Sequence, residues 1–142
     1  MTNIKNINQT TPDDVAEKLH NQADFALKNV LSIKENLSEK ENSELQKTLD
    51  DIIAMSYLGK YYADKIKGAL NQGLKNKIKQ DIVDYQDISR SYLKSAKIYL
   101  NKYTEIMAKN YKSPLLARVG KINWEELSRI YKNNIKSINT DL

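Results

Sequence analysis

Apolar and small residues recur through the middle of the chain at steps of three and four, with no proline among them. The repeat consists of Leu45, Leu49, Ile52, Ser56, Gly59, Ala63, Ile66, Leu70 and Gly73. This spacing places its members on one face of an α-helix that packs nearly parallel to a neighbour. A helix that continues to about residue 74 is on the order of 45 Å long at 1.5 Å per residue. We therefore expect a fold built around one long helix.

Two further helical repeats flank this helix. The first starts where Thr11 supplies an N-cap and Pro12 occupies the first helical position, and Ser113 and Pro114 are expected to stop the second, because proline disfavours a helical conformation in the residue before it. The inward faces are Val15, Leu19, Ala23, Ala26, Val30, Ile33 and Leu37 in the first, and Ile82, Tyr85, Ser89, Tyr92, Ala96, Tyr99, Tyr103 and Ile106 in the second.

The connections and the C-terminal part complete the predicted architecture. A capping box at residues 38–41 opens the long helix, and residues 71–77 are the best candidate for the second turn. Residues 115–122 are expected to lie extended, and Asn123 to cap a last helix in which Trp124 is a packing anchor. The sequence thus predicts an all-α fold, an antiparallel up-and-down bundle of about four helices, with a flexible tail at residues 1–10 and a single domain at residues 11–142.

Residue types that catalysis and cofactor binding require are scarce. There is no cysteine, and His20 is the only histidine; Glu17 lies three residues before it, but a di-iron bundle needs two such Glu-x-x-His pairs. A di-iron site, a catalytic triad and a thiolate metal site all lack ligands or partners, and no glycine-rich phosphate-binding motif occurs. Paired acids at positions 50–51 and 81–87 are better explained as surface and helix-start residues than as a catalytic pair. We expect no enzyme activity from this chain alone, no cofactor and no metal.

The charge distribution bears on possible partners. The net charge is +5, but the lysines are dispersed rather than gathered in one run, and the residues before position 57 lean acidic. A nucleic-acid partner is therefore not expected. No apolar stretch reaches the roughly 20 residues that span a bilayer, so membrane insertion is not expected either.

Tyrosine is the one overrepresented side chain, with nine tyrosines against one phenylalanine. Tyr57, Tyr61 and Tyr62 cluster on the long helix, and Trp124 stands at the start of the last one. Aromatic faces stack on sugar rings, and the hydroxyl adds a hydrogen bond. These four residues are candidate contacts for a carbohydrate or a partner, but their spacing is better explained by packing in the core, with the tyrosine hydroxyls at its edge.

Two segments, LDDIIAMSYLGKYYADKIKGA at residues 49–69 and YKSPLLARVGKINWEEL at residues 111–127, resemble the C-terminal helical region of large bacterial glycoside-hydrolase-like proteins. Those proteins are described as carbohydrate-binding or α-glucuronidase-like, and the start TPDDVA at residues 11–16 is similar to the beginning of that region. The resemblance implies a helical appendage whose catalytic residues lie in upstream domains, so none is carried over to this chain. The turn at residues 73–77 departs from the family pattern.

Two functions follow from these observations. The resemblance implies a non-catalytic helical domain of a polysaccharide-processing protein that packs against or assembles the catalytic part. The alternative is a free-standing helical interaction protein that associates through the repeat at residues 49–73. No signal peptide is recognised; the compartment is expected to be periplasmic or extracellular if the chain belongs to a larger secreted enzyme, and cytoplasmic otherwise.

Overall fold

The computed structural model describes residues 10–37, 43–77, 84–111, 115–117, 120–124, 126–130 and 133. It contains α1 (Pro12–Glu35), α2 (Ser43–Lys77), α3 (Tyr85–Asn110), β1 (Leu115–Ala117) and β2 (Gly120–Ile122). A further helical segment occupies Trp124 and residues 126–130. The predicted all-α antiparallel bundle is confirmed, and the two short strands form an antiparallel hairpin in the stretch expected to be extended.

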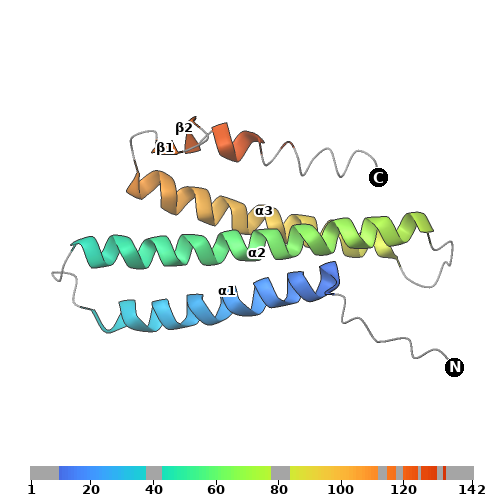
Figure 1. The fold of residues 1–142 in the computed structure, drawn as a ribbon, viewed down its shortest axis with the longest axis horizontal. Coiled ribbons are helices and arrows are strands. Elements are labelled where there is room, and N and C mark those ends of the chain that lie inside the picture. The colour runs from blue at the N-terminus through green and yellow to red at the C-terminus, as the bar shows by residue number, and fades with distance from the viewer. Residues whose placement is uncertain are drawn as a thin grey trace, which may run out of the picture.

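The long helix α2 lies between α1 and α3 (Figure 1). Pairs across each interface run in opposite directions along the sequence: Lys34 binds Asp50 while Ala23 lies against Gly59, and Asn110 binds Asp50 while Ser89 binds Gly68. Both neighbours are therefore antiparallel to α2. The middle helix supplies most of the surface on which the bundle is assembled.

Local sequence explains where the helices begin. Thr11 accepts a hydrogen bond from the Asp14 backbone amide, and the Asp14 carboxylate accepts one from the Thr11 amide, which is the predicted capping box. Asp84 caps α3 by accepting from the amides of Gln86 and Asp87. The capping box predicted at residues 38–41 lies outside the described residues.

One predicted connection is wrong. Residues 71–77 were expected to form the second turn, but α2 continues as a helix to Lys77. Gly68 and Gly73 both lie within it, and the Asn71 side chain donates to the Lys67 carbonyl oxygen without breaking the helix. A weak local propensity is overridden here in a helix that packs against α3 at Gly68, immediately before this stretch.

The core has two centres. The larger one joins α2, α3 and the C-terminal segment, and contains Ala54, Tyr61, Leu93, Ala96, Leu100, Tyr103 and Trp124. The smaller one joins α1 to the start of α2 through Val30, Leu49 and Ile53. Val15 and Ile33, predicted on the inward face of α1, are 40% and 49% exposed. Their exposure leaves apolar surface along α1 as well as along α2.

Candidate functional site

The rotation of α2 about its own axis is set by its contact with α1. Leu49, Ser56 and Ala63 are buried on this side. A Cβ atom added at Gly59 would lie 3.3 Å from the Cβ atom of Ala23. The predicted close approach at the small residues 56, 59 and 63 is thus confirmed.

The second side of α2 faces α3. Tyr61 is fully buried there, and the Ser89 hydroxyl donates to the Gly68 carbonyl oxygen at 2.8 Å. A Cβ atom at Gly68 would lie 2.8 Å from Cδ2 of Leu93. With two sides of the helix occupied by α1 and α3, the remaining side is open.

This third side of α2 carries a stripe of uncharged residues, here called the outer stripe. Its members are Ile52, Met55, Gly59, Tyr62, Ile66, Ala69 and Gly73, of which Gly59 lies at the border with α1, against Ala23. They follow one another at alternating steps of three and four, the repeat by which one helix packs along another. Ile52, Met55 and Tyr62 are 40%, 59% and 39% exposed. Large, partly exposed apolar side chains therefore continue along the helix.

A groove of about 410 Å³ runs between α1 and the first half of the outer stripe. We call it the outer groove. Its apolar lining comes from Leu19, Ala23, Ala26, Ile52, Met55 and Gly59, and its polar lining from Gln22, Thr48, Asp51 and Ser56.

Three of the four polar residues that line the outer groove are bonded within the chain. Ser56 donates to the Ile52 carbonyl oxygen at 2.8 Å, and Thr48 donates to the Glu44 carbonyl oxygen. Asp51 accepts from the Tyr111 hydroxyl through Oδ2, while its buried Oδ1 has no hydrogen-bond partner among the described residues. A site for a polar small molecule has several polar groups that converge on the ligand. The outer groove instead presents mainly apolar surface.

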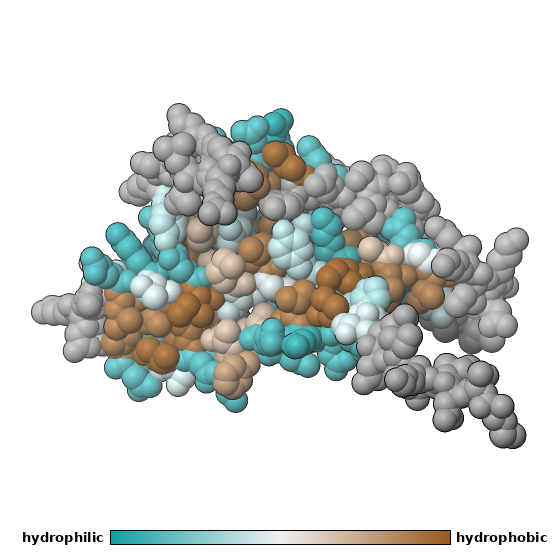
Figure 2. All heavy atoms as spheres, in the orientation of Figure 1, coloured by the Kyte–Doolittle hydropathy of each residue, from teal (hydrophilic) through white to brown (hydrophobic). Residues whose placement is uncertain are grey.

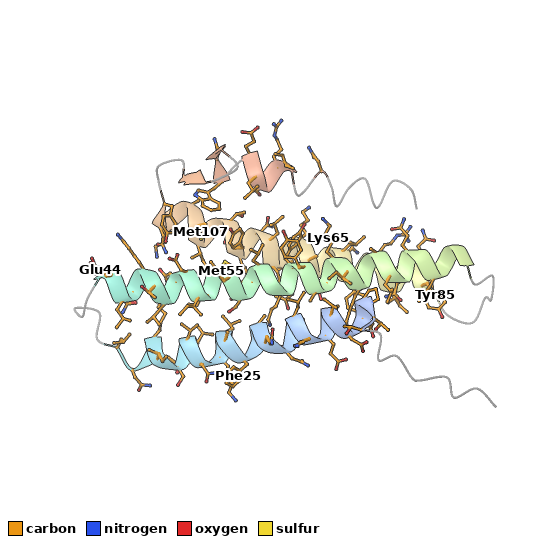
Figure 3. The ribbon with its side chains drawn as sticks, viewed as in Figure 1. Phe25, Glu44, Met55, Lys65, Tyr85 and Met107 are labelled. Carbon is orange, nitrogen blue, oxygen red and sulfur yellow. The ribbon has the colours of Figure 1, made fainter. Side chains whose placement is uncertain are left out.

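The molecular surface agrees with this description. Figure 2 shows a band of apolar residues over α1 and α2, bordered by hydrophilic residues. Met55 is labelled on α2 in Figure 3, and Phe25 lies on the side of α1 away from α2. Phe25 is 73% exposed, but it belongs to a different face from the outer groove.

Two of the four predicted contact residues lie in the core. Tyr61 is 0% exposed, and Trp124 is 8% exposed with its ring edge-on to Tyr103 at 6.0 Å. The packing role predicted for Trp124 is confirmed. Burial of both ring systems leaves neither face free to stack on a sugar without rearrangement of the core.

The other two contact residues point to different surfaces. Tyr57 is half-buried and stacks on Tyr99 at 6.2 Å, with the Lys102 ammonium 5.0 Å from its ring centre. Tyr62 is exposed on the outer stripe, and its ring centre lies 4.9 Å from that of Tyr61. The structure therefore does not gather Tyr57, Tyr61, Tyr62 and Trp124 into one platform.

Ion pairs tie the three helices together beside the groove. Asp50 binds Lys34 of α1 and accepts from Asn110 of α3 at 3.3 Å. Burial alone would raise the pKa of Asp50, but the hydrogen bonds from Lys34 and Asn110 and the nearby positive charges lower it overall. Tyr111 donates to Asp51 at 2.5 Å, and this hydrogen bond raises the pKa of Tyr111. These contacts fix the end of the bundle at which the groove begins.

A second polar cluster surrounds His20. Its imidazole lies 3.2 Å from Asp24, and Asp24 also binds Lys60 of α2. The hydrogen bond from Lys60 lowers the pKa of Asp24. Within the described ranges, no three histidine, cysteine or acidic side chains come together as metal ligands. The cluster is an inter-helix ion pair whose carboxylate is already engaged.

Sequence reasoning identified the long repeat but assigned only one apolar face to α2. Ile52, Gly59, Ile66 and Gly73 belong to both the predicted repeat and the outer stripe. Met55, Tyr62 and Ala69 were not assigned to any face. The signal that identifies them is the absence of a charged residue at all seven positions of the outer stripe, in a chain in which 29% of the residues are charged.

None of the helices in the described part of the chain has an apolar segment of the length needed to cross a membrane. Comparison with known protein families, curated proteins and solved structures found no match to this chain. The assignment of function therefore depends on the geometry of the surface.

Proposed function

We propose that this chain is a non-catalytic docking module whose outer groove binds an amphipathic helix. The observation that carries the proposal is the outer stripe: seven uncharged positions at heptad spacing on the open side of α2. Over residues 52–73 the stripe is about 32 Å long at 1.5 Å per residue. A helix is the element whose ridges match that spacing over such a length.

The chemistry of the groove supports a helix rather than a glycan. Sugar binding relies on hydrogen-bonding groups beside an aromatic face, whereas Thr48, Asp51 and Ser56 are bonded within the chain. Met55 is more exposed than Ile52 and Tyr62, and methionine adapts its shape to apolar partners. An exposed apolar surface of this kind, bordered by polar residues, is typical of interaction sites.

Site-specific photo-cross-linking in the source cells tests the proposal. Benzoylphenylalanine is placed at position 55 and, as a matched control, at the exposed position 94 of α3. We expect position 55, and not position 94, to cross-link to consecutive turns of one helix, which peptide mass spectrometry identifies. Failure of position 55 to cross-link to any polypeptide, with both variants folded, would contradict the docking function.

The polysaccharide-processing parent implied by the sequence resemblance stays a prediction. None of the contacts described above favours it over a stand-alone docking module. Intact-mass measurement of the native product separates the two, since a product well above 16.4 kDa would place this bundle in a larger protein.

A further inference from the structure

We infer that the helix bound in the outer groove is α2 of a second copy of this chain, antiparallel to the first. The inference rests on the proposed docking function and specifies its partner. In this arrangement a two-fold axis passes near Tyr62, and both copies use the same surface, as in an isologous dimer. Three observations favour a second copy over other occupants.

The first observation is the order of side-chain sizes along the outer stripe. The large residues Ile52 and Met55 lie near its start, and Ala69 and Gly73 lie near its end. An antiparallel copy brings the large residues of one chain opposite the small residues of the other. A parallel copy would instead set Ala69 and Gly73 against themselves and leave a gap, which costs stability in a packed interface.

The centre of the outer stripe fits the same arrangement. Gly59 and Ile66 lie three and four residues on either side of Tyr62, so the antiparallel copy sets the small residue of one chain near the large residue of the other. Tyr62 then meets its own counterpart. Its ring is 39% exposed and tilted at 59° to Tyr61, which leaves part of it open to a second aromatic ring.

The second observation is the charge polarity of α2. Its first half, residues 43–59, has three acids (Glu44, Asp50, Asp51) and one lysine, whereas residues 60–77 have five lysines (Lys60, Lys65, Lys67, Lys75, Lys77) and one acid. Antiparallel pairing places each acidic half beside the basic half of the partner. Parallel pairing would place like halves side by side. Because Asp50 and Lys60 are already paired within the chain, with Lys34 and Asp24, it is the net charge of each half that favours the antiparallel orientation.

The third observation is the length of the outer stripe, of which the outer groove covers only the first half. The C-terminal residues 131–142 would span about 18 Å even as a complete helix, against about 32 Å for the outer stripe. A second α2 matches the stripe in length because the two are the same element. Leu19, Ala23 and Ala26 of α1 line the outer groove, so α1 and α2 of both copies would form a four-helix arrangement.

The absence of cysteine allows a direct test by disulfide trapping. In an antiparallel dimer, a cysteine near the two-fold axis lies close to its own counterpart, whereas one far from the axis does not. We expect purified Tyr62→Cys to form a disulfide-linked dimer under mild oxidation. Met55→Cys alone should remain unlinked, but a mixture of Met55→Cys and Ala69→Cys should give the mixed dimer.

The outcomes separate this inference from the proposed function. Met55→Cys dimers without Tyr62→Cys dimers, or a wild-type protein that stays monomeric at tens of micromolar in sedimentation velocity, would overturn the antiparallel pairing. If the photo-cross-linker at position 55 then captured a helix of another polypeptide, the docking function would stand and only the partner would be wrong. Failure of both experiments would remove both proposals.

Discussion

Gly68 of α2 and Leu93 of α3 approach so closely that a Cβ atom at position 68 would stand 2.8 Å from Cδ2 and 2.9 Å from Cγ of Leu93. Leu93 is 1% exposed and therefore has little room to move. This contact and the Ser89 hydrogen bond to the Gly68 carbonyl oxygen set the separation of α2 and α3. They also fix which side of α2 remains open.

Gly68→Ala should destabilise the protein. The gain in helix propensity is about 1 kcal/mol, but overpacking costs typically 1–3 kcal/mol, and the short contacts with a buried leucine favour the larger cost. We expect a net loss of roughly 1–2 kcal/mol in urea unfolding.

Gly73→Ala is the matched control for Gly68→Ala, since a Cβ atom at Gly73 meets nothing within 4 Å. It should stabilise the monomer by up to about 1 kcal/mol, as alanine does in an open helix position. Equal effects of the two alanines would show that the α2–α3 contact is looser than described.

Tyr61→Ala should lower the free energy of unfolding by roughly 3–5 kcal/mol, because it removes a fully buried aromatic ring from the larger core. Tyr62→Ala, with 39% of the residue exposed, should cost much less. Urea unfolding at a concentration that keeps the chain monomeric measures both. A small cost at position 61 would contradict its place in the core.

Tyr111→Phe tests the hydrogen bond that joins the end of α3 to α2 at Asp51. The substitution removes the hydroxyl that donates to Asp51, and such a hydrogen bond to a charged group is worth about 1.5–3 kcal/mol. We expect a loss in the lower part of that range, since Tyr111 is only half-buried. Tyr92→Phe serves as the control. A Tyr111→Phe protein as stable as wild type would show that this hydrogen bond does not stabilise the fold.

Acid should weaken the bundle through its paired aspartates. The pKa values of Asp24 and Asp50 are lowered below 3.8 in the folded state. A carboxyl group whose pKa is lower in the folded state stabilises the fold at pH values above its pKa in the unfolded chain. This stabilisation disappears as the pH falls through its pKa in the folded state. The free energy of unfolding should therefore decrease as the pH falls below about 4.

The variant Asp50→Asn isolates one of these groups. It should be less stable than wild type at neutral pH, because Lys34 loses its charged partner, and its stability should fall less steeply in acid. Unfolding curves at several pH values measure both effects. A slope identical to that of wild type would show that Asp50 does not contribute to the acid sensitivity.

Local signals predicted much of the fold. Thr11, Pro12 and Asp14 identified the start of α1, and heptad spacing identified the length of α2 and the burial of Leu49, Ser56 and Ala63. The turn at residues 71–77 was wrong because local propensity does not include the packing of α3. Asp84 was noticed as an acid near a helix start, but its role as the N-cap needed the backbone geometry.

The candidate site was harder to predict for a specific reason. Periodicity shows that α2 has apolar residues at steps of three and four, but two overlapping stripes on α2 satisfy that rule. Only the placement of α1 shows that Ser56 and Ala63 are covered while Met55 and Tyr62 are not. The burial of Tyr61 and Trp124 in the core, and the separation of Tyr57 from Tyr62, likewise depend on tertiary packing.

The central claim is that the outer stripe is a docking surface, and charge substitution tests it most directly. Met55 and Ile98 are 59% and 56% exposed, on α2 and α3 respectively. Met55→Glu and Ile98→Glu are therefore matched, and both should leave helix content and unfolding of the monomer nearly unchanged. Sedimentation velocity across a range of concentrations then compares their self-association with that of wild type.

We expect wild type and Ile98→Glu to reach twice the 16.4 kDa monomer mass in the same concentration range. Met55→Glu should raise the dissociation constant by roughly a hundredfold or more, because an unpaired carboxylate would be buried in the interface. If Met55→Glu associates as tightly as wild type, the outer stripe is not the surface through which two copies of this protein associate.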